Sequence, residues 1–494
     1  MEENVLFNPN QPQQAGGALV PTPQTTQQPS ASQAPPPSTP PPPSQPQSPS
    51  SSPPPIKKRG GFVGMFIKLF VVLLVLLVMG IVVFQFVLPI FRGNSSSKDA
   101  ALTYWGLWES DATMQTIIDD FQKENPTITV NYEKRDIDKY RQTLQTRIQN
   151  GDGPDVFLYH NSWTPVVTNL LSPISSEVMD PQEFENVYYP VVVEDLTVEG
   201  AIYGIPMGID TVALFVNDSI FEETGANMPS TWEDFTNVSA GITVKDGENR
   251  IQTYGAGFGA YDNVNRAAEL LSLLFLQNRV NLTSPQETEG SMVEAIRFYT
   301  DFVTGRDNIE AVWNTSAPNS LISFAGGNVG MYFGYSWDIF VIKELNPELK
   351  FSVHSVPKLQ NDLTVASYWV NGISSNSRYP EAAQKFLSYL AKKETQEKLY
   401  TETSKVRLFG LPPARRDMAD MVRDNPYVYP FVAQAETAKS TFFVSDTYDE
   451  GLNDQMDAYL GNAIRSVLGN TSVESATETL ISGMEEVLAQ YGVN

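Results

Sequence analysis

The sequence predicts an α/β protein with two lobes, preceded by a polar tail and one hydrophobic segment. From residue 101 onward, strand-like and helix-like stretches alternate, which is typical of parallel sheets with crossover helices. About 400 residues follow the hydrophobic segment, more than one core usually organises, so two lobes are expected. The hydrophobic segment is a run of 22 residues without a charge.

Residues 1–60 form the predicted tail, which is disordered and cytoplasmic. Its first 55 residues are mostly Pro, Gln, Ser and Thr, with few large apolar side chains. Such a segment cannot bury enough apolar surface to offset its ordering entropy. The proline-rich run APPPSTPPPPS fits either a polyproline ligand for a partner domain or a plain spacer.

Residues 61–92 contain the predicted membrane span, Phe70 to Phe91, and residues 93–100 the linker that follows it. At about 1.5 Å per residue, the span reaches about 33 Å, enough for a bilayer core of about 30 Å. Basic residues concentrate before it, which places the N-terminus in the cytoplasm and the main domain outside. These flanking residues are Lys57, Lys58, Arg59 and Lys68 before the span, and Arg92 and Lys98 after it.

A cleaved signal peptide is the alternative interpretation of this segment. Signal peptides lie close to the chain start and end at small residues. Here 69 residues precede the run, and its end is bulky, so an uncleaved signal anchor is favoured. The chain has no cysteine, which excludes a lipidated cysteine, disulfides and thiolate metal sites.

Charge and composition narrow the function further. Up to residue 92 the chain has five basic and two acidic residues, which gives this part a net charge of +3. The whole chain has a net charge of −24, so the residues after 92 together carry −27. An acidic outer domain argues against nucleic acid as a partner. His160 and His354 are the only histidines, which leaves little material for a multi-histidine metal centre, and no cofactor is expected.

The first elements of the outer domain are predicted from residue spacing. Met114, Ile117, Ile118 and Phe121 fall on one helical face, and either Ser110 or Asp111 can cap the start of this helix. Ligands of such sheets bind beyond the carboxyl ends of the strands. The predicted elements are strands at 101–108, 127–134 and 154–160 and helices at 110–125 and 137–151.

Several segments, taken in order, resemble a known family. They are LTYWGLWES through GDGPDVFLYH (102–160), YGIPMGIDTVALFVNDSIFEETG (203–225), PSTWEDF (229–235), SLISFAGGNVGMYFGYSWDIF (320–340) and YWVNGISSNSRYPEAAQKFLSYLAKKETQEKLY (368–400). In this order they resemble the extracellular solute-binding proteins of ABC importers, in the carbohydrate-binding branch that includes maltose-binding protein. The resemblance covers roughly residues 101 to 490.

The resemblance implies a periplasmic-binding-protein-like fold, in which two α/β lobes close on a ligand through a hinge of two or three crossings. The implied lobe one is about 101–210 and 365–402, and lobe two about 215–355 and 405–494. A separate permease would receive the ligand from the closed form. The domain is expected to be a monomer without enzymatic activity.

The candidate ligand site combines tryptophans with polar side chains. All seven tryptophans lie in the outer domain. Sugars present C–H faces that suit aromatic rings, and their hydroxyls need a few fixed polar partners. The predicted ligand contacts are Trp108 and Glu109 after the first strand, Asn161 and Trp163 after the third, Trp369 and Asn371 in the loop returning to lobe one, and, by resemblance, Asp210 and Trp337.

Each predicted ligand contact also fits a structural role that involves no ligand. The tryptophans also suit surface or core packing, Asp210 a turn cap, and asparagines are common in loops for local backbone reasons. Arg407 fits either the cleft or the surface.

The expected function is a membrane-tethered protein that captures a carbohydrate and delivers it to an ABC permease. One alternative is a receptor that senses a ligand and signals through the anchor and tail. Another is a glycosidase with two carboxylates, although no spacing singles out a pair.

Overall fold

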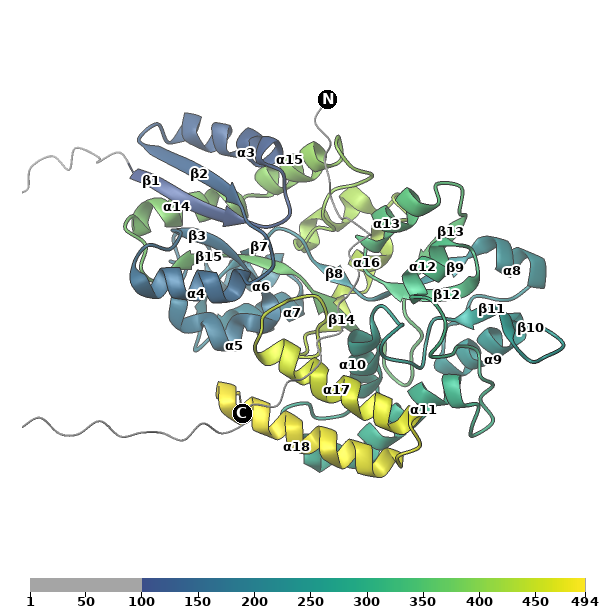
Figure 1. The fold of residues 1–494 in the computed structure, drawn as a ribbon. Coiled ribbons are helices and arrows are strands. Elements are labelled where there is room, and N and C mark those ends of the chain that lie inside the picture. The colour runs from purple at the N-terminus through teal and green to yellow at the C-terminus, as the bar shows by residue number, and fades with distance from the viewer. Residues whose placement is uncertain (1–99, 494) are drawn as a thin grey trace, which may run out of the picture. The chain divides into compact units, whose positions relative to one another are not determined.

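Two helix-covered β-sheets organise this protein in the computed structural model, which describes residues 100–493 (Figure 1). The predicted tail and the span Phe70–Phe91 lie outside the described residues. Within residues 100–493, no helix combines the length and the apolar character that crossing a bilayer requires.

The first sheet has the strand order β2-β1-β3-β15-β4, and β7 also pairs with β15. β1 runs parallel to β2 and β3, as the strand–helix alternation predicts, whereas β15 is antiparallel to its neighbours. The strands are β1 (Ala100–Gly106), β2 (Ile128–Lys134), β3 (Val156–His160), β4 (Leu171–Ser172), β7 (Ile205–Pro206) and β15 (Trp369–Ser374).

The helices of this first lobe begin and end at residues with clear local causes. The Ser110 side chain accepts a hydrogen bond from the Thr113 N–H and caps α3. Gly151 ends α4 in the left-handed conformation, with φ of 77°. The helices are α3 (Asp111–Glu124), α4 (Tyr140–Asn150), α5 (Thr164–Val167), α6 (Pro181–Val187), α7 (Pro190–Leu196), α14 (Pro380–Ala391) and α15 (Lys393–Thr403).

The second sheet has the order β10-β11-β12-β9-β13 and forms the centre of the second lobe. β12 is buried along its whole length, as expected for a strand covered on both faces. The strands are β9 (Ala213–Asn217), β10 (Val244–Lys245), β11 (Ile251–Ala256), β12 (Val329–Gly334) and β13 (Phe351–His354), and the helices are α8 (Asp218–Thr224), α9 (Trp232–Ile242), α10 (Ala267–Gln277), α11 (Glu289–Thr304), α12 (Ser320–Ala325) and α13 (Asp338–Leu345).

A small sheet, ordered β16-β14-β8, lies where the chain passes between the lobes. β8 (Asp210–Thr211) connects β7 of the first sheet to β9 of the second, and β14 (Thr364–Ser367) connects β13 back to β15. β16 (Ala438–Lys439) belongs to a third segment, which leads from the first lobe toward the C-terminal helices. These strands are the structural counterpart of a hinge with several crossings.

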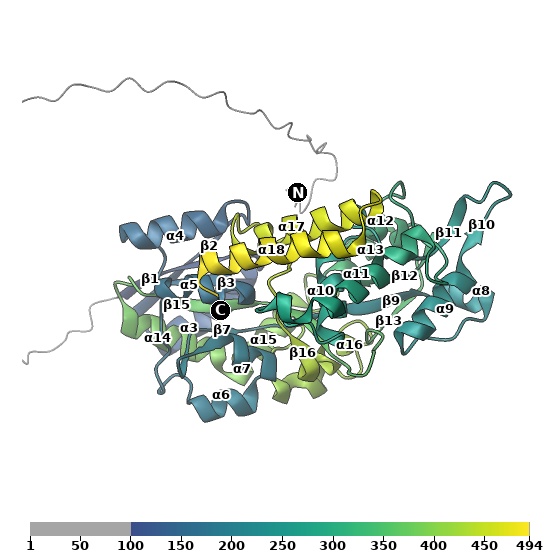
Figure 2. The same cartoon turned by 90° about the horizontal axis from the view of Figure 1, so that it is seen from below.

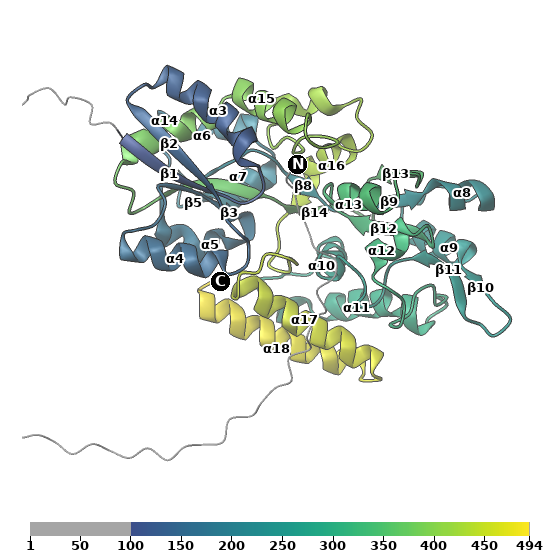
Figure 3. The same cartoon turned by 45° about the horizontal axis from the view of Figure 1, so that its top comes forward.

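The C-terminal helices α17 (Leu452–Leu468) and α18 (Val473–Tyr491) form a hairpin that packs against α11 of the second lobe (Figure 2 and Figure 3). The remaining helices and strands are short: β5 (Thr197–Val198), β6 (Ala201–Ile202), α16 (Tyr429–Ala433), and the 3₁₀ helices η2 (Asn161–Trp163), η3 (Thr168–Leu170), η4 (Pro285–Thr288), η5 (Arg416–Val422) and η6 (Ala435–Thr437).

Candidate functional site

Asp210 lies at the crossing between the two lobes and is buried. Its carboxylate accepts a hydrogen bond of 2.9 Å from the Ser336 N–H and another from the Ser336 hydroxyl, while the Thr211 N–H donates at 3.0 Å. Burial raises the pKa of Asp210 to about 8, and the bonds from Ser336 and Thr211 oppose that rise. Asp210 therefore ties the hinge strand β8 to the turn that follows β12.

A first aromatic group, Trp108, Trp163 and Trp369, lies at the carboxyl ends of β1 and β3 in the first lobe. The ring of Trp369 makes edge-to-face contacts with Trp108 at 5.5 Å and with Trp163 at 5.2 Å between centroids. Trp163 is fully buried, whereas Trp108 is 42% exposed. The most exposed ring of the group is therefore Trp108, which packs against Trp369, and Trp369 in turn packs against the buried Trp163.

A second aromatic group, Tyr335 and Trp337, lies after β12 in the second lobe. The two rings stack at 4.5 Å, and Trp337 is 39% exposed. The Arg266 guanidinium lies 5.4 Å from the Tyr335 ring centroid and 5.5 Å from that of Trp337. It also pairs with Asp338 at 3.2 Å. A buried cation therefore fixes the position of this group.

Hydrogen bonds bring the two aromatic groups together at the hinge. Ser367 of β14 lies opposite Asp210 of β8 in the small sheet. The Ser367 hydroxyl is 3.0 Å from His160 Nε2, and the His160 ring contacts Trp369 at 5.2 Å. On the other side, Asp210 holds Ser336, the residue between Tyr335 and Trp337. The groups thus flank the Asp210–Ser367 pair.

Glu109 follows Trp108 and is paired with Arg407 at 3.0 Å. The Arg407 guanidinium also lies 5.7 Å from the ring centroid of Phe340, one turn after Trp337 in α13. Arg407 therefore connects the end of the first sheet to α13, the helix that follows the second aromatic group. Its cation compensates the charge of Glu109.

Asn161 is buried rather than displayed on a loop surface. Its Nδ2 donates to Asp195 at 3.1 Å and to Ser440 at 2.7 Å, and its Oδ1 accepts from the Tyr368 N–H at 3.0 Å. Burial raises the pKa of Asp195 to about 6, although the hydrogen bonds from Ser440, Tyr368 and Asn161 act to lower it. This network joins η2 and α7 to two of the crossings.

The prediction that Trp369 and Asn371 lie in a loop is wrong, because both belong to strand β15. Asn371 is buried, accepts a hydrogen bond from Tyr104 at 2.6 Å and donates to the Ile205 carbonyl at 3.1 Å. Asn and Gly are uncommon in strands, so WVNGIS resembles a loop in sequence. The structure places Asn371 within the first sheet, away from the exposed ring of Trp108.

His160, Arg266 and Tyr335 join the site without having been predicted as contacts. Burial lowers the pKa of His160 to about 3, so its imidazole is neutral at physiological pH. The position of His160 at the end of a predicted strand, where ligands of such sheets bind, could have identified it from the sequence. Arg266 has no such signal, since its partner Asp338 is 72 residues away.

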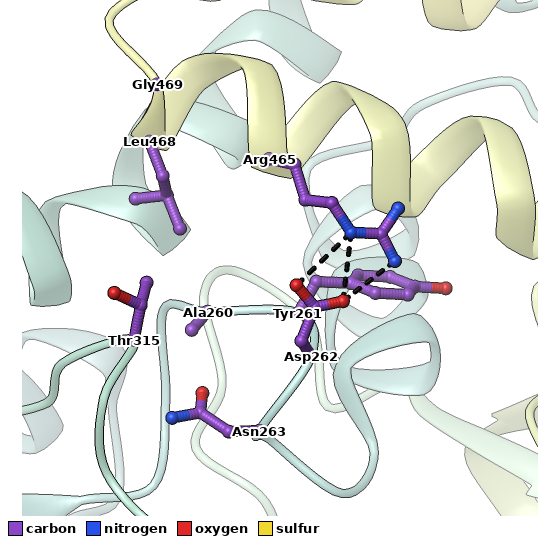
Figure 4. A pocket seen from close by; sticks show the side chains of 8 residues that line it. All are labelled: Ala260, Tyr261, Asp262, Asn263, Thr315, Arg465, Leu468 and Gly469. Atoms are coloured by element: carbon purple, nitrogen blue, oxygen red, sulfur yellow. Dashed lines mark hydrogen bonds and ion pairs between the residues drawn. The ribbon is translucent and has the colours of Figure 1, made fainter. Parts of the chain in front are cut away.

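A separate cavity of about 250 Å³ lies in the second lobe, between the segment after β11 and the end of α17 (Figure 4). Arg465 and Asp262 form an ion pair of 2.8 Å at one side of it (Figure 4). The lining residues are Ala260, Tyr261, Asp262, Asn263, Thr315, Arg465, Leu468 and Gly469. The predicted ligand contacts are all elsewhere. In residues 100–493 no group of three or more acidic or histidine side chains has a metal-binding arrangement.

Comparisons with known proteins agree with this architecture. The model of the bacterial extracellular solute-binding protein family matches residues 116–429. The multiple sugar-binding protein of Streptococcus mutans is 23% identical over 316 residues, covering 59% of this chain and 71% of its own length. The galactooligosaccharide-binding protein of Bacillus subtilis is 24% identical over 372 residues, covering 71% of this chain and 80% of its own.

Solved structures share the fold. The sugar-binding protein MalE from Xanthomonas citri superimposes with a TM-score of 0.64 at 21% identity, over 79% of this chain and 98% of its own. A cyclo/maltodextrin-binding protein complexed with maltotetraose gives a TM-score of 0.64 at 20% identity, over 80% and 99%. At these identities the likeness shows the two-lobed α/β fold.

Proposed function

The chain belongs to the bacterial extracellular solute-binding protein family, and from this premise we propose that it binds a carbohydrate between its two lobes. The observation that carries the proposal is the pair of exposed tryptophans, Trp108 and Trp337, which project from different lobes on either side of the Asp210 crossing. The relatives named as sugar-binding proteins support the same ligand class.

The chemistry of the site suits a neutral, polyhydroxylated ligand. Aromatic rings offer apolar faces to the C–H groups of a sugar ring. The cations near the rings are paired, since Arg407 pairs with Glu109 and Arg266 with both Asp338 and Asp446. A strongly charged ligand would need an unpaired counter-charge to replace its hydration. Of the predicted contacts, Trp108 and Trp337 are therefore the principal ones, with Trp369 and Trp163 in support.

Binding would favour the closed arrangement of the lobes. Because each lobe supplies one exposed ring, a ligand that contacts both rings binds the closed form more tightly than the open form. The short strands β8 and β14, with few residues each, are where backbone rotation would accompany closure. Delivery to an ABC permease is the accompanying proposal, since such a permease would distinguish closed from open.

A membrane tether is part of the same proposal. Phe70–Phe91 is uncharged and has its basic residues mainly on the N-terminal side, which supports a single-pass anchor with the binding domain outside the cell. An anchored monomer would remain close to its permease. The relatives are named as binding proteins, which supports a role in binding rather than in glycoside hydrolysis or signalling.

Calorimetry and thermal shift on the full chain in detergent micelles test this function. We expect saturable binding of a neutral mono- or oligosaccharide from a panel of gluco-, galacto- and manno-configured sugars. Trp337→Ala should weaken that binding about tenfold or more, equivalent to about 1.4 kcal/mol. Leu345→Ala, an exposed residue on the same helix α13, should leave it unchanged. Binding of peptides or polyamines in place of every sugar would contradict the proposal.

A further inference from the structure

The segment 445–453, here called the strap, leads into α17 and includes the first two residues of that helix, and it is fixed to the second lobe at its own first residues. The Asp446 carboxylate pairs with Arg266 Nη1 at 2.6 Å. The Ser445 N–H donates to Glu269 at 2.9 Å, and Arg266 and Glu269 are both buried. Because Arg266 also lies against the Trp337 ring, the start of the strap adjoins the second aromatic group.

The other end of the strap is fixed to the first lobe. Arg141, near the start of α4, donates from Nε to the Asp449 carbonyl at 2.8 Å, and the Asp449 side chain is fully buried. The Ser162 hydroxyl, in the turn after β3, donates to Asn453 at 2.9 Å. The strap thus joins both lobes, and it begins and ends at residues next to the two aromatic groups.

Tyr448 lies between these two anchors and is 50% exposed. Among residues 100–493, the aromatic members of the exposed large apolar set are Trp108, Trp337 and Tyr448. Three residues of the strap have positive φ: Asp446 at 61°, Tyr448 at 48° and Glu450 at 45°. Residues other than glycine adopt this backbone conformation at a cost in free energy. Such strain is found preferentially at ligand-binding segments.

We propose that Tyr448 is a third aromatic contact for the ligand, and that the ligand is a neutral oligosaccharide of two or more units. This inference rests on the proposed function. A single pyranose has two faces, which Trp108 and Trp337 suffice to cover. Tyr448 lies two residues after Asp446, which Arg266 links to Trp337, so its exposed ring offers a platform for a further sugar unit.

The test compares Tyr448 variants of the full chain by calorimetry, using an oligosaccharide that the wild type binds and the matching monosaccharide. Tyr448→Ala should weaken oligosaccharide binding about tenfold and change monosaccharide binding less than about twofold. Tyr448→Phe keeps the ring and should stay within about threefold of the wild type. Ile322→Ala, which removes an apolar side chain that is also 50% exposed, should have no effect.

Tyr448→Asn separates the ring from the backbone conformation. Asparagine tolerates the left-handed region, so this variant removes the ring while its unliganded melting temperature stays at or above that of the wild type. We expect the same loss of oligosaccharide binding as for Tyr448→Ala. If both variants bind the oligosaccharide like the wild type while Trp337→Ala does not, this inference is wrong and the proposed function stands. If the wild type binds no carbohydrate, both fail.

Discussion

At the scale of single residues, three ionisable groups with shifted pKa values lie where the chain crosses between the lobes. Asp210 holds Ser336 and Thr211, Asp195 holds Asn161, and His160 is neutral beside Ser367. Burial raises the pKa of both carboxyl groups and lowers that of the imidazole. The unfolded chain has ordinary pKa values, so the stability of the crossings depends on pH.

The first prediction concerns Asp210 and pH. Its folded pKa of about 8 lies above the unfolded value of 3.8, so the folded state binds more protons between these values. The stabilisation from this group is complete below the unfolded pKa and is lost as pH rises through the folded pKa. We expect the melting temperature of Asp210→Asn to decline less than that of the wild type between about pH 5 and pH 8.

A pH series of thermal unfolding measures this difference. Asp234→Asn is the matched control, since Asp234 is only partly buried and its hydrogen bonds from Ser230 and Thr231 lower its pKa. Its profile should parallel the wild type over that range. Parallel profiles for Asp210→Asn as well would contradict the raised pKa.

Residue roles that depend on contacts between residues far apart in the chain could not be predicted from the sequence. Trp108 and Trp337 were predicted as ligand contacts, and both are exposed at the site, where their role remains a proposal. Arg266 was missed because its partners Asp338 and Asp446 lie 72 and 180 residues away. Asn371 was predicted in a loop because local propensity does not reveal that β15 pairs with β3.

At the scale of elements, local signals predicted the first lobe well. The helix predicted at 110–125 is α3, capped by Ser110, with Met114 and Phe121 in the core. The helix predicted from residue 137 begins only at Tyr140, after Lys139 in the left-handed conformation. The strap has no periodic sequence pattern from which its structure could be predicted. Its position depends on contacts with α4, more than 300 residues earlier in the chain.

The second prediction concerns the anchor between α4 and the strap. Arg141→Met leaves the fully buried Asp449 side chain without its cation, so we expect the free energy of unfolding to decrease by about 3 kcal/mol. Arg147→Met on the same helix breaks an exposed pair with Asp152 and should cost about 0.5 kcal/mol or less. Urea unfolding curves measure both. Equal costs for the two variants would show that the buried anchor contributes no more than a surface pair.

At the scale of the whole molecule, the short strands β8 and β14 join the two lobes, so the carbohydrate proposed to bind between the lobes would contact both. The family and the two-lobed α/β fold predicted from the ordered segments are confirmed. The segments that carried the resemblance include the hinge strand β8 and the second aromatic group, so they located the candidate site as well. The contacts of Arg407 and the strap, which bridge the lobes, became visible only in three dimensions.

The distance between the lobes, measured with and without a sugar, tests directly whether the protein closes around its ligand. The chain has no cysteine, so Glu133→Cys at the end of β2 and Glu344→Cys on α13 allow specific spin labelling. We expect a saturating carbohydrate to shift the distance distribution toward shorter values, and we expect Trp337→Ala to require more sugar for the same shift. An unchanged distribution at a sugar concentration that saturates binding would contradict closure of the two lobes around the ligand.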